Sequence, residues 1–338
     1  MIFLDVTKTG PSGHRSGLTR VSGRLREELG EAATTGRWPE IGAAVRRADD
    51  WFLTAEIFSP EERPGFAEFL DRRPGRRAAI FHDAIPLKHP HITWPQSVAR
   101  MPGYLKMLAR FDRVWAVSEA SRRELVDFWR WQGVEKTPAV EVLALGADFN
   151  SAPRVTSRPA ARGRGLLCVG IVEPRKNQGF LLDVAETLWG EGLAFELHVV
   201  GRVNPHFGAP LVARMKALRR RFAGMQFHEA TSDATVARLY ATTRATVFPT
   251  IAEGCGLPLL ESLWMGVPCV GSDLSVLREN AARGGCVLVA PNDPAAWLAA
   301  LRRVLTDDAE HARLAQEAAT RALPTWAATA QALRAALA

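Results

Sequence analysis

One stretch of the sequence, Phe248–Pro268, constrains the fold more than any other. An apolar run suited to a strand leads into it, a turn bracketed by Gly254 and Gly256 follows, and helical periodicity begins near Pro258. Proline favours the first turn of a helix because it fixes φ and lacks an N–H that this turn leaves unbonded. A helix that follows a glycine turn directs free backbone N–H groups outward. The stretch therefore predicts an anion site, most often a phosphate site.

Two carboxylates flank this predicted anion site, Glu253 before the turn and Glu261 one turn inside the helix. Because like charges repel, neither is expected beside a phosphate, and each is predicted to accept hydrogen bonds from hydroxyl groups. An anion between two groups that bind hydroxyls describes a nucleotide sugar. The residues whose backbone is predicted to hold its diphosphate are Gly254, Cys255, Gly256 and Leu257.

A second predicted anion site follows the apolar strand Leu166–Ile171. Arg175 and Lys176 immediately precede a helix that Asn177 is predicted to cap, and two cations at a helix start favour an anion. Arginine outnumbers lysine about six to one in this chain, so Lys176 is expected to have a specific role.

Glu253 and Glu261, eight positions apart around Gly-Cys-Gly-Leu-Pro, resemble the E-x7-E signature of retaining glycosyltransferases of family four. The segment Glu-Pro-Arg-Lys-Asn, which contains Arg175 and Lys176, resembles the same family. The resemblance implies the GT-B fold, an α/β architecture of two Rossmann-like parallel-sheet domains that face each other across a cleft. Some relatives place a further arginine where this chain has Ile171, so the diphosphate is expected to depend on Arg175 and Lys176.

The resemblance also implies a role for each residue of the second domain. Arg175 and Lys176 would neutralise the donor diphosphate, Glu261 would bind the ribose, and Glu253 would bind the hexose. The loop that contains Ala230 and Thr231 would lie against the nucleotide base.

In the first half of the chain, His82 ends the predicted strand Ala78–Phe81. Its segment His-Asp-Ala-Ile-Pro-Leu resembles mannosyltransferase-like members of the family, in which a histidine borders the sugar-binding cleft. We therefore predict His82 as a site residue, with a histidine bonded inside the fold as the alternative. Gly17 follows a glycine-containing loop, and the resemblance implies that it touches the donor diphosphate and the acceptor, unless that loop is a plain connection. Ser118 is predicted to cap a helix.

A chain of 338 residues is too long for one ordinary core, and the pattern of strands and helices predicts two domains. They are an acceptor-binding domain over residues 1–149 and a nucleotide-sugar-binding domain over 166–323. A linker rich in Pro, Ser, Arg and Gly joins them over 150–165, and a last helix over 324–338 is expected to cross back to the first domain. Inside the first domain, a helix is predicted over Pro60–Leu70.

Composition narrows the class of protein. With 47% hydrophobic and 23% charged residues the chain is typical of a globular protein, and Met1–Val6 is expected to be a first strand and not a signal peptide. The four cysteines have no metal-binding spacing, which predicts reduced thiols, a cytoplasmic location and no metal site. The net charge of +7 is scattered over the chain and accompanies no nucleic-acid motif, so a nucleic-acid partner is not expected. Contact with the inner face of a membrane through the helices Tyr104–Phe111 and Glu124–Trp131 is the alternative use of this charge.

These patterns together predict a bacterial-type, metal-independent hexosyltransferase without a cofactor. The donor is predicted to be a nucleoside diphosphate sugar, with GDP-mannose as the best guess, and the acceptor a glycan or lipid-linked glycan. The alternatives are a nucleotide-sugar-binding protein that has lost catalysis and another GT-B enzyme such as a sugar-nucleotide epimerase.

Overall fold

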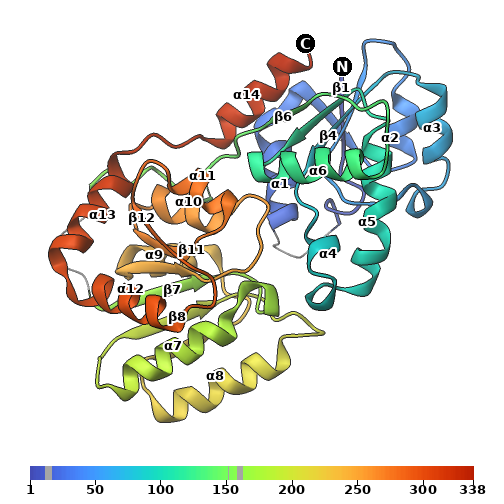
Figure 1. The fold of residues 1–338 in the computed structure, drawn as a ribbon. Coiled ribbons are helices and arrows are strands. Elements are labelled where there is room, and N and C mark those ends of the chain that lie inside the picture. Colours follow the sequence, from blue (N-terminus) through green and yellow to red (C-terminus); the bar gives the residue numbers. More distant parts are fainter. Residues whose placement is uncertain (12–16, 151, 158–162) are drawn as a thin grey trace. The chain divides into compact units, whose positions relative to one another are not determined.

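The computed structural model describes residues 1–11, 17–150, 152–157 and 163–338, which form two compact units. The first unit contains Met1–Gly146 together with Pro324–Ala338, and the second contains Ala147–Leu323. Each unit is built on its own parallel sheet of six strands with helices beside it (Figure 1). The predicted α/β architecture of two Rossmann-like domains is confirmed.

The elements of the first unit are β1 (Ile2–Asp5), α1 (Gly17–Leu29), η1 (Gly30–Ala32), β2 (Ala33–Gly36), α2 (Glu40–Ala44), β3 (Trp51–Thr54), η2 (Pro60–Glu62), α3 (Phe66–Arg72), β4 (Arg76–Phe81), α4 (Ile85–Lys88), η3 (Pro90–Ile92), α5 (Pro95–Leu108), β5 (Arg113–Ala116), α6 (Glu119–Trp131), β6 (Val140–Val142) and α14 (Trp326–Ala336). The η labels mark 3-10 helices.

The elements of the second unit are β7 (Gly165–Val169), η4 (Pro174–Lys176), α7 (Gln178–Gly190), β8 (Glu196–Val200), α8 (Ala209–Arg221), β9 (Met225–His228), α9 (Asp233–Thr242), β10 (Ala245–Phe248), α10 (Leu257–Trp264), β11 (Cys269–Ser272), α11 (Ser275–Ala281), β12 (Cys286–Val289), α12 (Pro294–Thr306) and α13 (Asp308–Thr320).

In both sheets, the side on which the chain adds successive strands changes once. The first sheet has the order β2-β1-β3-β4-β5-β6, so the chain adds β2 on one side of β1 and the later strands on the other. The second has the order β12-β11-β10-β7-β8-β9, so β8 and β9 lie on one side of β7 and β10 on the other. We call these places the first switch point, between β1 and β3, and the second switch point, between β7 and β10. Ligands of open parallel sheets bind beyond the carboxyl ends of the strands at such places.

The core of the second unit has a layer on each face of its sheet, because neighbouring residues of a strand point to opposite faces. Leu166 of β7 packs with buried residues of α7, α8 and α12. Leu167, the next residue, packs with Val236 and Tyr240 of α9 on the other face. The helices α7, α8 and α12 thus cover one face and α9 covers the other.

The segment after β6 is attached to the second unit. Phe149 is 2% exposed in the core of that unit, and Arg154 donates to the carbonyls of Leu263 and Ala318, both at 2.6 Å. Trp264 Nε1 donates to the carbonyl of Ala152 at 2.8 Å. The described part of the predicted linker therefore packs against the second unit through specific hydrogen bonds, and residues 158–162 lie outside the described range.

The last helix, α14, packs on the first unit beside α1 (Figure 1). Trp326 is 1% exposed, and Thr329 Oγ1 donates to the carbonyl of Ala144 at 2.8 Å. Its backbone comes so close to Gly146 that a Cβ on that glycine would lie 2.2 Å from the nitrogen of Trp326. Two stretches of chain that are distant in the sequence thus complete one unit.

Local chemistry explains where the elements of the first unit differ from prediction. The predicted helix Pro60–Leu70 is divided into η2 and α3, because Gly65 adopts φ +76° at the start of α3, where a continuous helix cannot pass. The capping of α6 agrees with prediction, since Ser118 Oγ accepts from the backbone N–H of Ser121 at 3.0 Å.

Candidate functional site

The loops that follow β7 and β10 leave from either side of the second switch point, and they are bonded to each other. The backbone N–H of Ile251 donates to the carbonyl of Arg175 at 3.0 Å, and Thr250 Oγ1 lies 3.1 Å from the same carbonyl. One loop leads into α7 and the other into α10. The two segments that were predicted separately as anion sites therefore lie at one place.

Three side-chain donors converge on a single oxygen at this place, Oε1 of Glu253. Lys176 Nζ lies 2.5 Å from it and Arg175 Nη1 lies 3.0 Å from it. Thr250 Oγ1 is the third donor, at 2.7 Å. On its other side, Arg175 is bonded to Glu173 Oε1 through Nε at 3.0 Å. We call these four ionisable residues, Glu173, Arg175, Lys176 and Glu253, the switch-point cluster.

Burial makes the charges of this cluster strongly interdependent. The side chains of Lys176 and Glu253 are 10% and 9% exposed. Burial, the largest influence, lowers the pKa of Lys176, and Glu253 opposes it. Burial raises the pKa of Glu253, but the charges of Lys176 and Arg175 outweigh that effect and hold it below its usual value. Glu253 is therefore ionised at neutral pH, and its carboxylate favours the charged form of Lys176.

The start of α10 lies on the same loop as Glu253. Gly256 is its N-cap with φ +80°, a conformation that a side chain would strain, and a Cβ there would lie 2.6 Å from a methyl of Leu277. Leu257 is the first residue of the helix and Pro258 the second, one place later than predicted. Pro258 has no N–H, and those of Leu259 and Leu260 donate to the carbonyl of Gly256. The helix nevertheless begins on the loop that contains Glu253, so the positive end of its dipole favours an anion there.

Two other predicted residues of this stretch are also buried. Glu261 is 2% exposed inside α10. Asn280 Nδ2 donates to the carbonyl of Cys255 at 2.6 Å, which fixes the turn before the helix. Burial raises the pKa of the Cys255 thiol to about 12, so this cysteine stays protonated at neutral pH.

Ala230 and Thr231 follow β9, at the carboxyl end of the outermost strand on the other side of β7. Ala230 has φ +48°, an unusual conformation for a residue with a side chain. The loop shares the carboxyl edge of the sheet with the switch-point cluster, but β8 lies between β9 and β7, and both β8 and β7 lie between β9 and β10.

His82 and Gly17 belong to the first unit, whereas the other ten predicted site residues belong to the second. Gly17 begins α1, and residues 12–16 of the loop before it lie outside the described range. His82 is 8% exposed, and its Nε2 is 2.8 Å from the carbonyl of Ala55, to which it donates. Burial lowers the pKa of this imidazole to about 4, so it is neutral at physiological pH. The hydrogen bond from His82 to Ala55 is the kind of contact expected from the alternative prediction, in which this histidine is bonded inside the fold.

The sequence analysis missed a second charged cluster, which lies at the first switch point. Arg63 bonds Asp5 Oδ2 through Nη1 and Glu56 Oε2 through Nη2, both at 2.5 Å. The three side chains are at most 2% exposed. A signal was present, since Asp5 ends one apolar strand and Glu56 follows another, but only the strand order reveals that these strands are neighbours.

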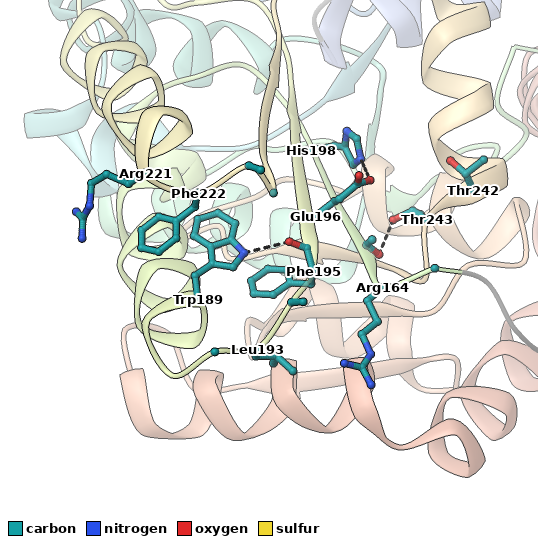
Figure 2. A pocket seen from close by; sticks show the side chains of 16 residues that line it. Arg164, Trp189, Leu193, Phe195, Glu196, His198, Arg221, Phe222, Thr242 and Thr243 are labelled. Carbon is teal, nitrogen blue, oxygen red and sulfur yellow. Dashed lines mark hydrogen bonds and ion pairs between the residues drawn. The ribbon is translucent and has the colours of Figure 1, made fainter.

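The second unit also has a pocket of about 850 Å³, which Figure 2 shows from close by. It lies at the opposite end of the sheet from the switch-point cluster, because it is lined by residues at the amino ends of β7 and β8. One wall of the pocket consists of stacked aromatic rings. The ring centroid of Trp189 lies 5.0 Å from that of Phe195 and 5.2 Å from that of Phe222 (Figure 2). The residues that line it include none of those predicted for the site, among those the structure describes.

Comparison with known proteins identifies the family. Residues 163–307 match the family described as "Glycosyl transferases group 1". The chain is 29% identical over 326 residues to the serotype-specific mannosyltransferase WbdA of Escherichia coli, a match that covers 83% of this chain and 40% of the relative. The chain is thus similar in sequence to glycosyltransferases, and its two-domain fold is of the GT-B type. This confirms the resemblance inferred from the E-x7-E segment.

This chain is also similar to other bacterial proteins. It is 31% identical over 233 residues to a D-inositol 3-phosphate glycosyltransferase of Geodermatophilus obscurus, which covers 62% of this chain and 49% of the relative. The sucrose-phosphate synthase of Thermosynechococcus elongatus has the same fold, with a TM-score of 0.72, 18% identity and coverage of 98% and 96%. The chain spans 38–40% of the length of the three mannosyltransferases that it matches over 326 residues.

Within the described residues of this glycosyltransferase, no three His, Cys, Asp or Glu side chains are grouped as they would be around a metal ion. None of its described helices is both long and apolar enough to cross a membrane.

Proposed function

We propose that this chain transfers a hexose from a nucleoside diphosphate sugar to a hydroxyl group of a glycan or lipid-linked glycan. Mannose is the proposed sugar, since several relatives are named mannosyltransferases. The observation that carries the proposal is the meeting of two loops at the second switch point, where Arg175 and Lys176 lie beside the start of α10. Cations and the positive end of a helix dipole together suit a diphosphate.

In the proposed reaction, the bond between the anomeric carbon and a phosphate oxygen breaks while the acceptor oxygen attacks from the same face. The acceptor hydroxyl gives its proton to the departing phosphate oxygen, so the anomeric configuration is retained and the nucleoside diphosphate leaves. Negative charge grows on the leaving group, and fixed positive groups that are already in place stabilise it most effectively. Arg175, Lys176 and the positive end of the α10 dipole supply that charge in the proposal.

The remaining predicted residues take supporting roles. Glu261 is proposed to accept hydrogen bonds from the ribose hydroxyls, and Glu253 from the hexose hydroxyls. The loop of Ala230 and Thr231 is proposed to border the base. The roles of His82 at the sugar-binding cleft and of Gly17 beside the donor diphosphate and the acceptor stay predictions. We propose further that transfer needs no divalent metal or cofactor, so the rate should not change when EDTA is added.

A cytoplasmic location with peripheral contact at a membrane also stays a prediction. The basic residues of α6 give it limited support, because three of them are in ion pairs with acidic neighbours. Arg122 and Arg123 pair with Glu119, and Arg130 pairs with Asp127. Trp131, which is 77% exposed at the end of α6, is the residue whose substitution would test membrane contact.

A panel of nucleoside diphosphates and their sugars tests the proposal. A ligand that binds only the folded protein raises its melting temperature, so one base should give a clear thermal shift. The selected sugar donor should then lose its sugar to a mannan-type acceptor or, more slowly, to water, with release of the nucleoside diphosphate. If no donor of the panel raises the melting temperature and none is consumed, the proposed function is wrong. A donor that binds without turnover would point to an inactive binding protein, and a new sugar nucleotide formed without acceptor would point to an epimerase.

A further inference from the structure

The switch-point cluster carries no net charge, although it is the proposed diphosphate site. Arg175 and Lys176 contribute two positive charges, and Glu173 and Glu253 contribute two negative charges. All four side chains are at most 22% exposed, so solvent screens these charges incompletely. A diphosphate that entered while both carboxylates stayed in place would bring its own charge next to theirs.

The carboxylate of Glu253 lies at the position where the diphosphate of the donor is expected. Its Oε1 already accepts from Lys176 Nζ and Arg175 Nη1, the cationic donors that a phosphate oxygen would use. The carboxylate is thus a built-in anion at the proposed anion site. The charge argument in the sequence analysis, which separated Glu253 from the phosphate groups, overlooked that a carboxylate can pair with the same cations.

We propose that the incoming diphosphate displaces the Glu253 carboxylate from Arg175 and Lys176, and that this exchange makes the site favour sugar-bearing diphosphates over bare ones. The proposal rests on the proposed function. A displaced carboxylate in a buried site must find new hydrogen-bond donors, because leaving it unpaired is costly. The hexose hydroxyls of the donor supply such donors, and a nucleoside diphosphate without sugar does not.

The exchange gives Glu253 a second role beyond holding the sugar. Before transfer, the hexose compensates for the ion pairs that Glu253 gives up. After transfer, the bare diphosphate no longer offers that compensation, and the carboxylate returns to the two cations and competes with the product. Glu253 thereby favours product release as well as donor selection.

Glu173 is the matched control, because it belongs to the same cluster and is held differently. Its Oε1 bonds Arg175, while its Oε2 accepts from Asn204 Nδ2 at 3.0 Å, which ties the carboxylate to a second loop. The three bonds to Glu253 instead converge on Oε1, and the carboxylate precedes the glycine turn at Gly254 and Gly256. Removing either carboxylate changes the cluster by one charge, but only Glu253 is proposed to move.

The experiment compares Glu253→Gln and Glu173→Gln with the parent by isothermal titration. The probes are inorganic pyrophosphate, GDP and GDP-mannose, or the corresponding pair of whichever base the thermal panel selects. In the parent we expect the sugar nucleotide to bind more tightly than the bare diphosphate. In Glu253→Gln, pyrophosphate and the bare diphosphate should bind about tenfold more tightly, while the sugar nucleotide gains little, so the preference for sugar is lost. In Glu173→Gln, all three probes should gain affinity together and the preference should stay.

Two further readouts keep the outcomes distinct. Melting temperatures measured without ligand show that both variants fold. The titrations are made at mildly acidic as well as at neutral pH. Burial lowers the pKa of Lys176, and each variant removes a neighbouring anion that raises it, so the mildly acidic buffer favours the charged form of Lys176. If the parent binds neither the bare nor the sugar-bearing diphosphate, the proposed function fails. If the parent binds both and Glu253→Gln keeps the parental preference, the displacement proposal fails while the proposed function stands.

Discussion

The two switch points of this protein use similar charged residues in opposite ways. At each one, an arginine contacts two carboxylates that lie at or after the ends of different strands. At the first, Arg63 joins Asp5 and Glu56, whose side chains are fully buried. At the second, Arg175 joins Glu173 and Glu253, and the three side chains are between 9% and 22% exposed.

The first cluster is closed by its own backbone. Oε1 of Glu56 accepts from the backbone N–H of Lys8 at 2.8 Å and from that of Thr9 at 2.7 Å. These N–H groups follow β1, where a mononucleotide-binding sheet would hold a phosphate. Glu56 therefore occupies the anion site of the first sheet permanently, and Arg63 neutralises it.

The second cluster is held mostly by side chains. Glu253 accepts from Lys176, Arg175 and Thr250, all through groups that can rotate away. The comparison teaches that the number of backbone partners and the completeness of burial separate a structural ion cluster from a proposed binding site. In both clusters an arginine pairs with two carboxylates at a switch point, so this pairing alone does not distinguish them.

The largest expected effect would come from opening the first cluster. Arg63→Met should lower the free energy of unfolding by about 3–5 kcal/mol, because it leaves two buried carboxylates without their cation. Urea unfolding of the variant and the parent measures this. Arg47→Met is the control, since Arg47 and its partner Asp49 are 70% and 63% exposed and such pairs contribute under about 1 kcal/mol. Equal stability of Arg63→Met and the parent would show that the first cluster is not structural.

The converse change is Lys176→Met, which keeps the side-chain stem that packs near Gly170 and Phe248. We expect turnover with the selected donor to fall about 10²–10³-fold, the usual loss when one fixed group facing a developing negative charge is removed. The melting temperature should change little, because Arg175 still neutralises Glu253. Steady-state kinetics measure the first result and calorimetry the second. A Lys136→Met variant, in an exposed position, controls for the general loss of one positive charge.

The pH dependence of stability sharpens the comparison, because His82 donates to Ala55, the residue between Thr54 and Glu56. Its pKa is about 4 in the folded chain and 6.5 in a model peptide. Below pH 6.5 the unfolded chain takes up a proton that the folded chain does not, so stability falls as the pH drops from 6.5 towards 4. The full loss is about 3 kcal/mol at about 1.4 kcal/mol per pKa unit.

His82→Asn should remove this part of the pH dependence, which chemical unfolding at a series of pH values would measure. The exposed His91→Asn variant is the control. If His82→Asn and the parent lose stability equally over this range, burial does not hold the imidazole neutral.

The smallest effect is expected at Glu261, inside α10. Glu261→Gln should weaken donor binding about tenfold, the typical loss for one hydrogen bond to a charged group. The bare nucleoside diphosphate and the sugar nucleotide should lose affinity equally, and the thermal shifts that they produce should both decrease. The reason is that the proposed contact is to the ribose, which both ligands contain, and not to the hexose. A variant that loses affinity for the sugar nucleotide alone would instead assign Glu261 to the hexose.

Much of the fold could be predicted, because buried parallel strands are apolar runs with polar residues after them. Ala78–Phe81 was predicted within β4 on this basis. The strand β2, Ala33–Gly36, was missed, since two exposed threonines between Ala33 and Gly36 give no apolar run. Its place beside β1 depends on tertiary contacts that a local pattern does not contain.

The loops that form the site could be predicted, but the contacts between them could not. Glycines, proline and basic residues before helices indicate anion sites locally, so Arg175, Lys176 and the Gly254–Gly256 turn were found. That Glu253 pairs with Arg175 and Lys176 depends on β7 and β10 being neighbours, which the sequence does not state. The cluster of Asp5, Glu56 and Arg63 was missed for the same reason.

The return of α14 to the first unit has a consequence for biosynthesis. A ribosome releases the chain from its amino end, and the second unit is one continuous stretch, Ala147–Leu323. That stretch can complete its core while α14 is still being translated. The earlier-made unit must wait for Trp326 and Thr329, so its apolar surface under α14 stays open until the second unit has been translated. Of the two units, the one that is begun first is completed last.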